Sequence, residues 1–312
     1  MQYYMAPMEG LTGYIYRNAY HKHYGGVDKY FTPFLTNKKL SHKEINDIMP
    51  EHNEGMNVVP QILTNRVEDF LCIAREVEKY GYQTVNLNLG CPSGTVVAKN
   101  RGAGFLALPK ELDAFLEEIF EKCPLGISIK TRIGRESPEE WERLLGIYEK
   151  YPLEELIIHP RVQKDFYRNH VNLESFRMAE ERSCHTLCYN GDICSVENYK
   201  KIEEAFPKVR KIMIGRGLLK KPWLIREIIH SESDIYSKER LRAYHDDILS
   251  GYTSVMYGDK NTLFKMKELW VYLGESFTNS EKYLKKIRKC ERIKDYEICV
   301  NALFREQELM EE

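Results

Sequence analysis

The sequence predicts a (β/α)₈ barrel followed by a small all-helical domain. Short β-branched and aromatic runs alternate with amphipathic segments between Tyr3 and Gly215, a pattern typical of a parallel sheet covered by helices. Eight such runs occur, and eight is the number of strands that closes a barrel. After Pro222 the chain contains no further proline, and apolar residues recur there at helical spacing.

Each run is interpreted as one barrel strand. The predicted strands are residues 3–7, 29–34, 58–62, 84–88, 127–131, 156–159, 186–190 and 211–215. Helices are predicted after the third strand, where residues 67–77 place apolar side chains on one face, and over residues 138–151. The apolar positions of the tail include Leu241, Tyr244, Ile248, Leu263, Met266, Leu269, Trp270 and Leu273. We therefore expect a catalytic barrel domain at residues 1–237 and a helical domain at residues 238–312.

Composition excludes several classes of protein. The formal net charge is −1, so no bulk positive field attracts nucleic acid, and RNA contact would need a local basic patch. The eight cysteines form no CxxC pair, and we interpret them as reduced thiols, with Cys72 and Cys123 as small buried hydrophobic residues. The N-terminus lacks the features of a signal peptide, and no apolar run is long enough to span a membrane. We expect a cytoplasmic monomer that binds no metal.

Active sites of such barrels lie at the carboxyl ends of the strands, and polar residues are concentrated there. The third strand ends in Gln61, whose amide both donates and accepts hydrogen bonds. On the fourth strand Asn86 and Asn88 alternate onto the barrel side, where each needs a partner. Gly90-Cys91-Pro92 follows, and this setting favours a partly exposed, proton-donating thiol at Cys91 over a buried one.

The remaining strand ends add charge and glycine. Lys130-Thr131-Arg132 ends the fifth strand and His159-Pro160-Arg161 ends the sixth. Asn190-Gly191-Asp192 and Gly215-Arg216-Gly217 end the seventh and eighth strands, where barrels often bind phosphate. No hydrolytic carboxylate pair, metal triad, GxGxxG or GxxxxGK[ST] motif is present. The inventory therefore favours FMN over a sugar phosphate or a dinucleotide.

Together with Ala6-Pro7-Met8-Glu9-Gly10 and Gly102-Ala103-Gly104, these motifs resemble the tRNA-dihydrouridine synthase family. The resemblance implies bound FMN, NADPH or NADH as external reductant, and Cys91 as the general acid. Two departures are Pro160, where the family usually has glycine, and Phe105, where a smaller residue is common; both bear on which uridine is accepted. The implied cofactor contacts are Pro7, Met8, Glu9, Gln61, Asn88, Lys130, His159, Asn190, Gly191, Asp192, Gly215 and Arg216.

A basic segment in the tail is the predicted RNA contact. Residues 260–294 hold ten Lys or Arg and four Glu, although on charge alone a solvated face is the better interpretation. The resemblance makes tRNA the expected partner, contacted by Asn88, Arg132, Arg161, Lys285, Lys286 and Arg288. Two alternatives stay open. One is an FMN barrel that acts on a small molecule, as dihydroorotate oxidoreductases do, and the other is an RNA-binding protein on an inactive barrel.

Overall fold

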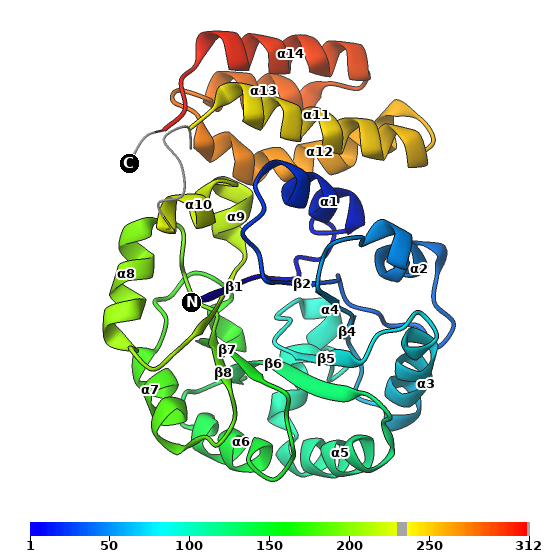
Figure 1. Ribbon diagram of the computed structural model, residues 1–312, viewed down its shortest axis with the longest axis vertical. Coiled ribbons are helices and arrows are strands. Elements are labelled where there is room, and N and C mark those ends of the chain that lie inside the picture. Colours follow the sequence, from blue (N-terminus) through cyan, green and yellow to red (C-terminus); the bar gives the residue numbers. More distant parts are fainter. Residues whose placement is uncertain (230–235, 311–312) are drawn as a thin grey trace. The chain divides into compact units, whose positions relative to one another are not determined.

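The predicted barrel is present in the computed structural model, which describes residues 1–229 and 236–310 (Figure 1). Its strands are parallel, in the order β3-β2-β1-β9-β8-β7-β6-β5-β4. The two outer segments of that order, β3 (Val58–Val59) and β4 (Gln61–Ile62), are separated in the chain by Pro60 alone. They form one interrupted strand, and the Pro60 carbonyl accepts a hydrogen bond from the Asn86 N–H at 2.9 Å. The nine segments thus occupy the eight predicted strand positions.

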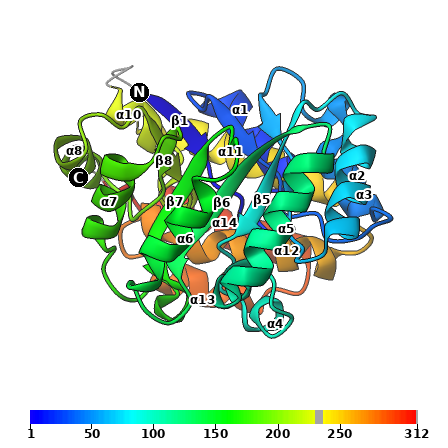
Figure 2. The same cartoon turned by 90° about the horizontal axis from the view of Figure 1, so that it is seen from below.

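The other strands lie at the predicted positions, and most of their ends fall within two residues of the predicted ones. The remaining strands are β1 (Gln2–Met5), β2 (Lys29–Phe31), β5 (Thr84–Leu89), β6 (Gly126–Gly134), β7 (Leu156–Val162), β8 (Leu187–Tyr189) and β9 (Lys211–Ile214). The helices between strands are α1 (Tyr14–His23), α2 (His42–Ile48), α3 (Val67–Glu78), α4 (Gly94–Val97), α5 (Pro109–Lys122), α6 (Glu140–Tyr148), α7 (Leu173–Arg182) and α8 (Val196–Ala205). Short 3₁₀ helices lie at Pro50–His52, Gly102–Ala107, Gln163–Asp165 and Gly274–Ser276. Figure 2 shows α5, α6 and α7 outside strands β5 to β8.

Three strand ends differ from the prediction by three residues, those of β2, β6 and β7. Strand β2 stops at Phe31, two residues before Pro33, which has no N–H to donate to a neighbouring strand. Strands β6 and β7 are longer than predicted, because their ladder continues past a register shift between Arg132 and Gly134. As a result Lys130-Thr131-Arg132 and His159-Pro160-Arg161 lie within strands and not after them.

The barrel interior is apolar in its middle and ionic at its amino-terminal end. Tyr4, Ala6, Phe31, Val59, Ile157, Cys188 and Met213 form one buried cluster. At the amino-terminal end the Glu155 carboxylate accepts hydrogen bonds from Lys29 at 2.7 Å, Lys211 at 3.0 Å and the Tyr4 hydroxyl at 3.0 Å. Burial raises the pKa of Glu155, but the two lysines lower it further, to a net value below the ordinary one. This end of the barrel is closed by an ion cluster drawn from four strands or their flanks.

The chain divides into two compact units. The first holds Met1–Pro7, Asp28–Asp192 and Lys200–Ile214, and the second holds Met8–Val27, Ile193–Tyr199 and Gly215–Glu312. The predicted division between residues 237 and 238 adjoins residues 230–235, which lie outside the described residues, and it stays a prediction.

The second unit is helical. It contains α9 (Arg216–Lys220), α10 (Leu224–Ile228), α11 (Lys238–Val255), α12 (Asp259–Leu273), α13 (Glu281–Lys289) and α14 (Ile293–Glu306). Helices α11 to α14 lie alongside one another (Figure 1). The predicted apolar positions Leu241, Tyr244, Leu263 and Trp270 are buried, as expected for a core. Among the described residues, no helix combines the length and apolar character needed to cross a bilayer.

Candidate active site at the strand carboxyl ends

A chain of buried amides crosses strands β4, β5 and β6. The Asn88 side-chain N–H donates to Gln61 Oε1 at 2.7 Å, and Gln61 Nε2 donates to Asn86 Oδ1 at 2.7 Å. Asn86 in turn donates to the Ser128 hydroxyl at 2.8 Å, which donates to the Val85 carbonyl at 3.3 Å. The two asparagines are thus partnered, as the sequence required. The chain fixes the orientation of Gln61 and Asn88 without the help of solvent.

Asn88 also shapes the loop that carries Cys91. Its Oδ1 accepts hydrogen bonds from the Gly90 N–H at 3.0 Å and the Cys91 N–H at 2.9 Å. The Cys91 carbonyl accepts the Ala103 N–H at 3.1 Å. Cys91 is partly exposed, in agreement with the predicted rim position.

The glycines of Gly102-Ala103-Gly104, downstream of Cys91, are required for steric reasons. Gly102 has φ +55°, and a Cβ there would lie 2.9 Å from the Cys91 carbonyl oxygen and 3.0 Å from Cys91 Cβ. A Cβ at Gly104 would lie 2.8 Å from the Val97 carbonyl oxygen. Real Cβ atoms do not approach other heavy atoms so closely, so both positions require glycine for the backbone to pack against the Cys91 loop.

Lys130 is the neighbour of Asn88 in the register of β5 and β6. It is half-buried, and within residues 1–229 and 236–310 its amine makes no hydrogen bond or ion pair. Burial and the nearby Arg132 guanidinium lower the pKa of Lys130 to about 8. Among the residues that the structure describes, no carboxylate pairs with this cation, which is the environment expected for a ligand that is electron-rich or anionic.

Arg132 is fully buried and holds three backbone segments together. Its Nε donates to the Gly90 carbonyl at 3.0 Å, Nη1 to the Val162 carbonyl at 2.8 Å and Nη2 to the Phe166 carbonyl at 2.7 Å. Nearby, Gln163 Nε2 donates to the Pro92 carbonyl at 3.1 Å. These bonds attach the loop after β7 to the Cys91 loop, so the guanidinium predicted to contact RNA is already engaged by the protein.

Arg161, the second arginine predicted to contact RNA, is also buried and engaged. Its guanidinium forms a two-pronged ion pair with the half-exposed Asp192 carboxylate, and its Nε donates to the Asn169 carbonyl at 2.6 Å. Nη1 lies 3.1 Å from His159 Nε2. Because a guanidinium only donates, Nε2 must accept, and the His159 ring carries its proton on Nδ1. The His159 ring also stacks on Tyr167, with ring centroids 5.9 Å apart.

The predicted phosphate loop of the barrel unit follows β8. The Asn190 side chain donates to the Met213 carbonyl at 2.8 Å, which links the end of β8 to β9. A Cβ at Gly191 would overlap the Tyr189 hydroxyl at 2.1 Å, so packing of that tyrosine demands glycine. Pro7 follows β1 in the same unit and is half-buried.

The other predicted cofactor contacts belong to the helical unit. The Met8 N–H donates to the Thr12 hydroxyl at 2.8 Å, and Glu9 is exposed. Gly215 caps the five-residue helix α9, of which Arg216 is the first residue. Lys285, Lys286 and Arg288 lie exposed on α13, whose opposite face buries Tyr283 and Ile287.

Two cysteine interpretations were wrong. Cys72 is exposed and Cys123 only partly buried, although all eight cysteines carry free thiols as predicted. On α3 the buried face runs through Phe70, Ile73, Ala74 and Val77, and Cys72 lies off it. The helical spacing of its neighbours contained the signal that composition alone missed.

Ser128 and Gln163 were not predicted as parts of the site. A serine on a strand and a glutamine after one carry no spacing signal of their own. Their roles depend on Asn86 and Pro92, which lie 42 and 71 residues away in the chain.

The parallel barrel and its polar strand ends define a (β/α)₈-barrel enzyme, and comparison with known proteins gives the family. Residues 4–310 match the family described as dihydrouridine synthase (Dus). The chain belongs to this family of flavin-dependent oxidoreductases.

Curated relatives agree with this family, and a solved structure agrees with the fold. The tRNA-dihydrouridine synthase B of Pasteurella multocida (strain Pm70) is 26% identical over 232 residues, covering 72% of this chain and 67% of the relative. The tRNA-dihydrouridine(16) synthase of Pseudomonas putida is 27% identical over 232 residues, 71% of each chain. Among solved structures, morphinone reductase superposes with a TM-score of 0.50 at 13% identity, over 74% of this chain and 86% of that one. At that identity the likeness shows the fold alone.

Proposed function

We propose that this protein reduces specific uridines of tRNA to dihydrouridine, with FMN as cofactor. The observation that carries the proposal is the group formed by Gln61, Asn88, Lys130 and the Cys91 loop at the strand carboxyl ends, in a chain whose relatives bear the name tRNA-dihydrouridine synthase. Amides suit the polar edge of a flat heterocycle, and an unneutralised amine suits an electron-rich ring.

The residues fit FMN chemically. Lys130 provides a positive charge without a protein partner among the described residues, and Gln61 and Asn88 are oriented amides. In the barrel unit we propose that Pro7, Gln61, Asn88, Lys130, His159, Asn190, Gly191 and Asp192 hold the cofactor. The sequence predicts the same role for Met8, Glu9, Gly215 and Arg216, which belong to the helical unit, and for these four residues it stays a prediction.

In this proposal FMN supplies the hydride for C6 of the uracil, with NADPH, or alternatively NADH, as the external reductant. Cys91 donates the proton that C5 receives, because its loop presents a partly exposed thiol beside Asn88. A uridine stacked in an RNA helix cannot reach a barrel, so the base must be flipped out of its stack at a cost of a few kcal/mol. We assign Arg132 and Arg161 to holding this site in shape, since their donors are engaged within the protein.

The exposed basic face of α13 is proposed to bind the RNA backbone. Lys285, Lys286 and Arg288 are exposed, and phosphate neutralisation by such side chains supplies affinity without sequence preference.

The test of the proposed chemistry is the variant Cys91→Ala. We expect the purified variant to retain its yellow colour and its reduction by NADPH, while turnover on tRNA lacking dihydrouridine falls at least 100-fold, as is typical for loss of a general acid. Cys72→Ala, which removes an exposed thiol from α3, is the matched control and should keep full turnover. Unchanged turnover in Cys91→Ala would remove Cys91 from the mechanism.

The two alternatives make different predictions for the same preparation. A barrel reductase for small molecules would oxidise NADPH with orotate-like pyrimidines as the electron acceptor and ignore tRNA. An RNA-binding protein on an inactive barrel would bind tRNA with steep salt dependence and show no flavin absorbance.

A further inference from the structure

A second group of reactive side chains lies at the opposite end of the barrel from Cys91. Glu149 directly follows α6, and Cys184 and His185 lie in the loop that precedes β8. One ligand atom from each of the three side chains lies within 4.8 Å of the others. All three residues belong to the barrel unit, and none has a role in the proposed reaction.

The His185 ring is oriented as a metal ligand would be. Its Nε2 lies 3.0 Å from the Tyr148 carbonyl, which only accepts, so Nε2 carries the proton and Nδ1 has the free lone pair. Nδ1 lies 3.9 Å from Cys184 Sγ. Metal-binding histidines commonly donate their other N–H to a backbone carbonyl, which fixes both ring and tautomer.

Glu149 supplies a fixed negative charge. Burial raises the pKa of its carboxyl, but hydrogen bonds from the Cys184 N–H at 2.9 Å and the Ser183 hydroxyl at 2.5 Å lower it further, so the carboxylate is the stable form. The same carboxylate raises the pKa of the Cys184 thiol. A cation placed among these groups would relieve that repulsion and stabilise the thiolate.

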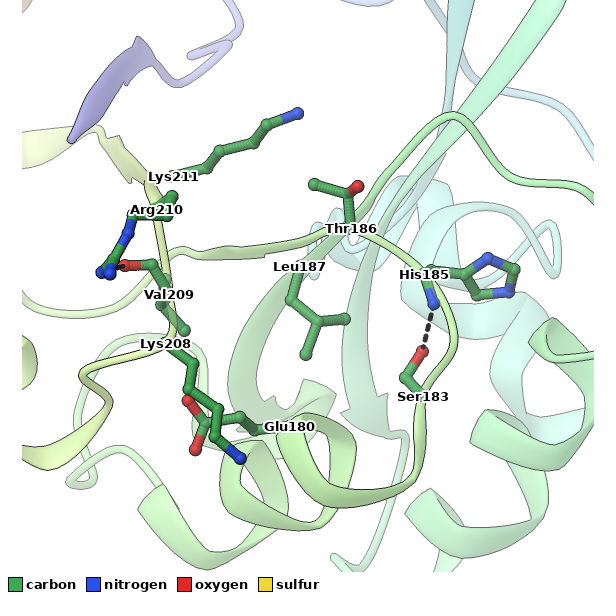
Figure 3. Close-up of a pocket in the computed structure, with 9 residues that line it drawn as sticks. All are labelled: Glu180, Ser183, His185, Thr186, Leu187, Lys208, Val209, Arg210 and Lys211. Atoms are coloured by element: carbon green, nitrogen blue, oxygen red, sulfur yellow. Dashed lines mark hydrogen bonds between the residues drawn. The ribbon is translucent and has the colours of Figure 1, made fainter.

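His185 also borders a cavity, but its ring points away from the other residues there (Figure 3). A cavity of about 250 Å³ lies beside the starts of β8 and β9, and its lining includes Ser183, His185 and Lys211 (Figure 3). In Figure 3 the His185 imidazole points away from the other lining side chains. The ring instead lies against Glu149 and the Tyr148 carbonyl, with its Nε2 3.7 Å from Glu149 Oε1.

We propose that Glu149, Cys184 and His185 form a binding site for a thiophilic divalent cation of the zinc class, with solvent completing the coordination. Thiolate, imidazole and carboxylate together match Zn²⁺, whereas Mg²⁺ and Ca²⁺ prefer oxygen ligands alone. Bonds of about 2.3 Å to sulfur and about 2.0 Å to nitrogen at a tetrahedral angle separate the two ligand atoms by about 3.5 Å. The observed 3.9 Å needs only a small adjustment of the exposed Cys184 side chain.

Occupancy of the site would tie the end of α6 to the loop before β8. Because both segments lie at the amino-terminal end of the barrel, the cation would stabilise the fold and leave the reaction at the other end unaffected. This inference is independent of the proposed function.

The test uses the full-length protein, reduced and freed of metal by a chelator, with Co²⁺ as the probe. We expect one equivalent of Co²⁺ to bind and to give a near-ultraviolet charge-transfer band from thiolate to cobalt. Added Zn²⁺ should displace the Co²⁺ and remove this band. Cys184→Ser should abolish the band and His185→Gln should weaken Co²⁺ binding at least 10-fold. Cys72→Ser, which removes another exposed thiol, should leave both unchanged.

A second readout needs no variant. Zn²⁺ at one equivalent should slow alkylation of Cys184 by iodoacetamide at least 10-fold, measured by peptide mass spectrometry, while Cys72 stays equally reactive. The proposal is overturned if wild type shows no charge-transfer band, if the band persists in Cys184→Ser, or if protection of Cys184 requires millimolar Zn²⁺.

Discussion

At the scale of single residues, a substitution of Arg161 tests whether this side chain stabilises the fold or contacts RNA. Its guanidinium is buried between Asp192 and His159, so Arg161→Met should remove both the hydrogen bond to His159 and the ion pair with Asp192. We expect a loss of about 2 kcal/mol in the free energy of unfolding, less than for a fully buried pair because Asp192 is 38% exposed. Urea denaturation measures this loss.

The control is Arg182→Met, which breaks an exposed pair with Glu142 and should cost less than about 0.5 kcal/mol. Nitrogen-15 NMR of labelled histidine gives an independent readout, because His159 should lose its single Nδ1–H tautomer only in the Arg161 variant. Equal stability of the two variants would assign Arg161 to the RNA surface after all.

Gly102 tests whether the shape of the Cys91 loop matters. In Gly102→Ala the new methyl group would meet the Cys91 carbonyl oxygen at 2.9 Å, at a residue whose φ of +55° already disfavours a side chain. We expect a loss of about 2 kcal/mol in unfolding free energy and a fall in tRNA turnover, since the Cys91 loop must shift. Gly94→Ala, where no atom lies within 4 Å of the new Cβ, should change neither quantity.

The sequence identified single residues best where several local signals coincided. Asn88, Gly90 and Cys91 combined strand alternation, a glycine and a family motif, and in the structure Asn88, near the end of β5, accepts hydrogen bonds from the N–H groups of Gly90 and Cys91. The buried positions of Arg132 and Arg161 were not predictable, because an arginine at the end of a strand is usually solvated. Only the carbonyls of distant loops, such as Val162 and Phe166, make burial of Arg132 tolerable.

At the scale of elements, the ion cluster around Glu155 joins strands that are far apart in the chain. The folded-state pKa of the Glu155 carboxyl lies below its ordinary value of 4.5, so the contribution of this carboxylate to stability is complete above about pH 4.5. That contribution is lost as the pH falls through the lower folded-state pKa.

Glu155→Gln should therefore cost about 2–3 kcal/mol at pH 7, because Lys29 and Lys211 are left beside a neutral group. The difference in unfolding free energy between wild type and variant should shrink steadily below pH 4.5. A difference that stays constant between pH 7 and pH 3 would show that the carboxylate charge contributes nothing.

The order and number of the strands followed from alternation alone, because each β/α unit carries its own hydrophobic period. The strand ends did not. Polar residues in β6 and β7 interrupt the apolar pattern, so the sequence did not indicate that the pairing of these strands continues from Arg132 and His159 to Gly134 and Val162. The Glu155 cluster was equally hidden, since its lysines lie 126 and 56 residues away.

At the scale of the whole molecule, two activities are expected to reside in different compact units. The barrel unit carries Cys91 and Lys130, whereas the basic helix α13 belongs to the helical unit. A triple variant with Lys285, Lys286 and Arg288 all changed to Ala should thus separate RNA binding from redox chemistry.

We expect this triple variant to bind tRNA more weakly and with a shallower salt dependence. If all three cations neutralise phosphates, the slope of log affinity against log salt should fall by about 2 to 3 units. Reduction of the bound flavin by NADPH should proceed at the wild-type rate, because that step involves no RNA. A charge-matched control replaces Lys39 in the loop before α2, Lys110 on α5 and Arg143 on α6, all of them exposed, and should leave the salt slope unchanged. If both triple variants reduced the slope equally, RNA binding would reflect diffuse charge and α13 would lose its assigned role.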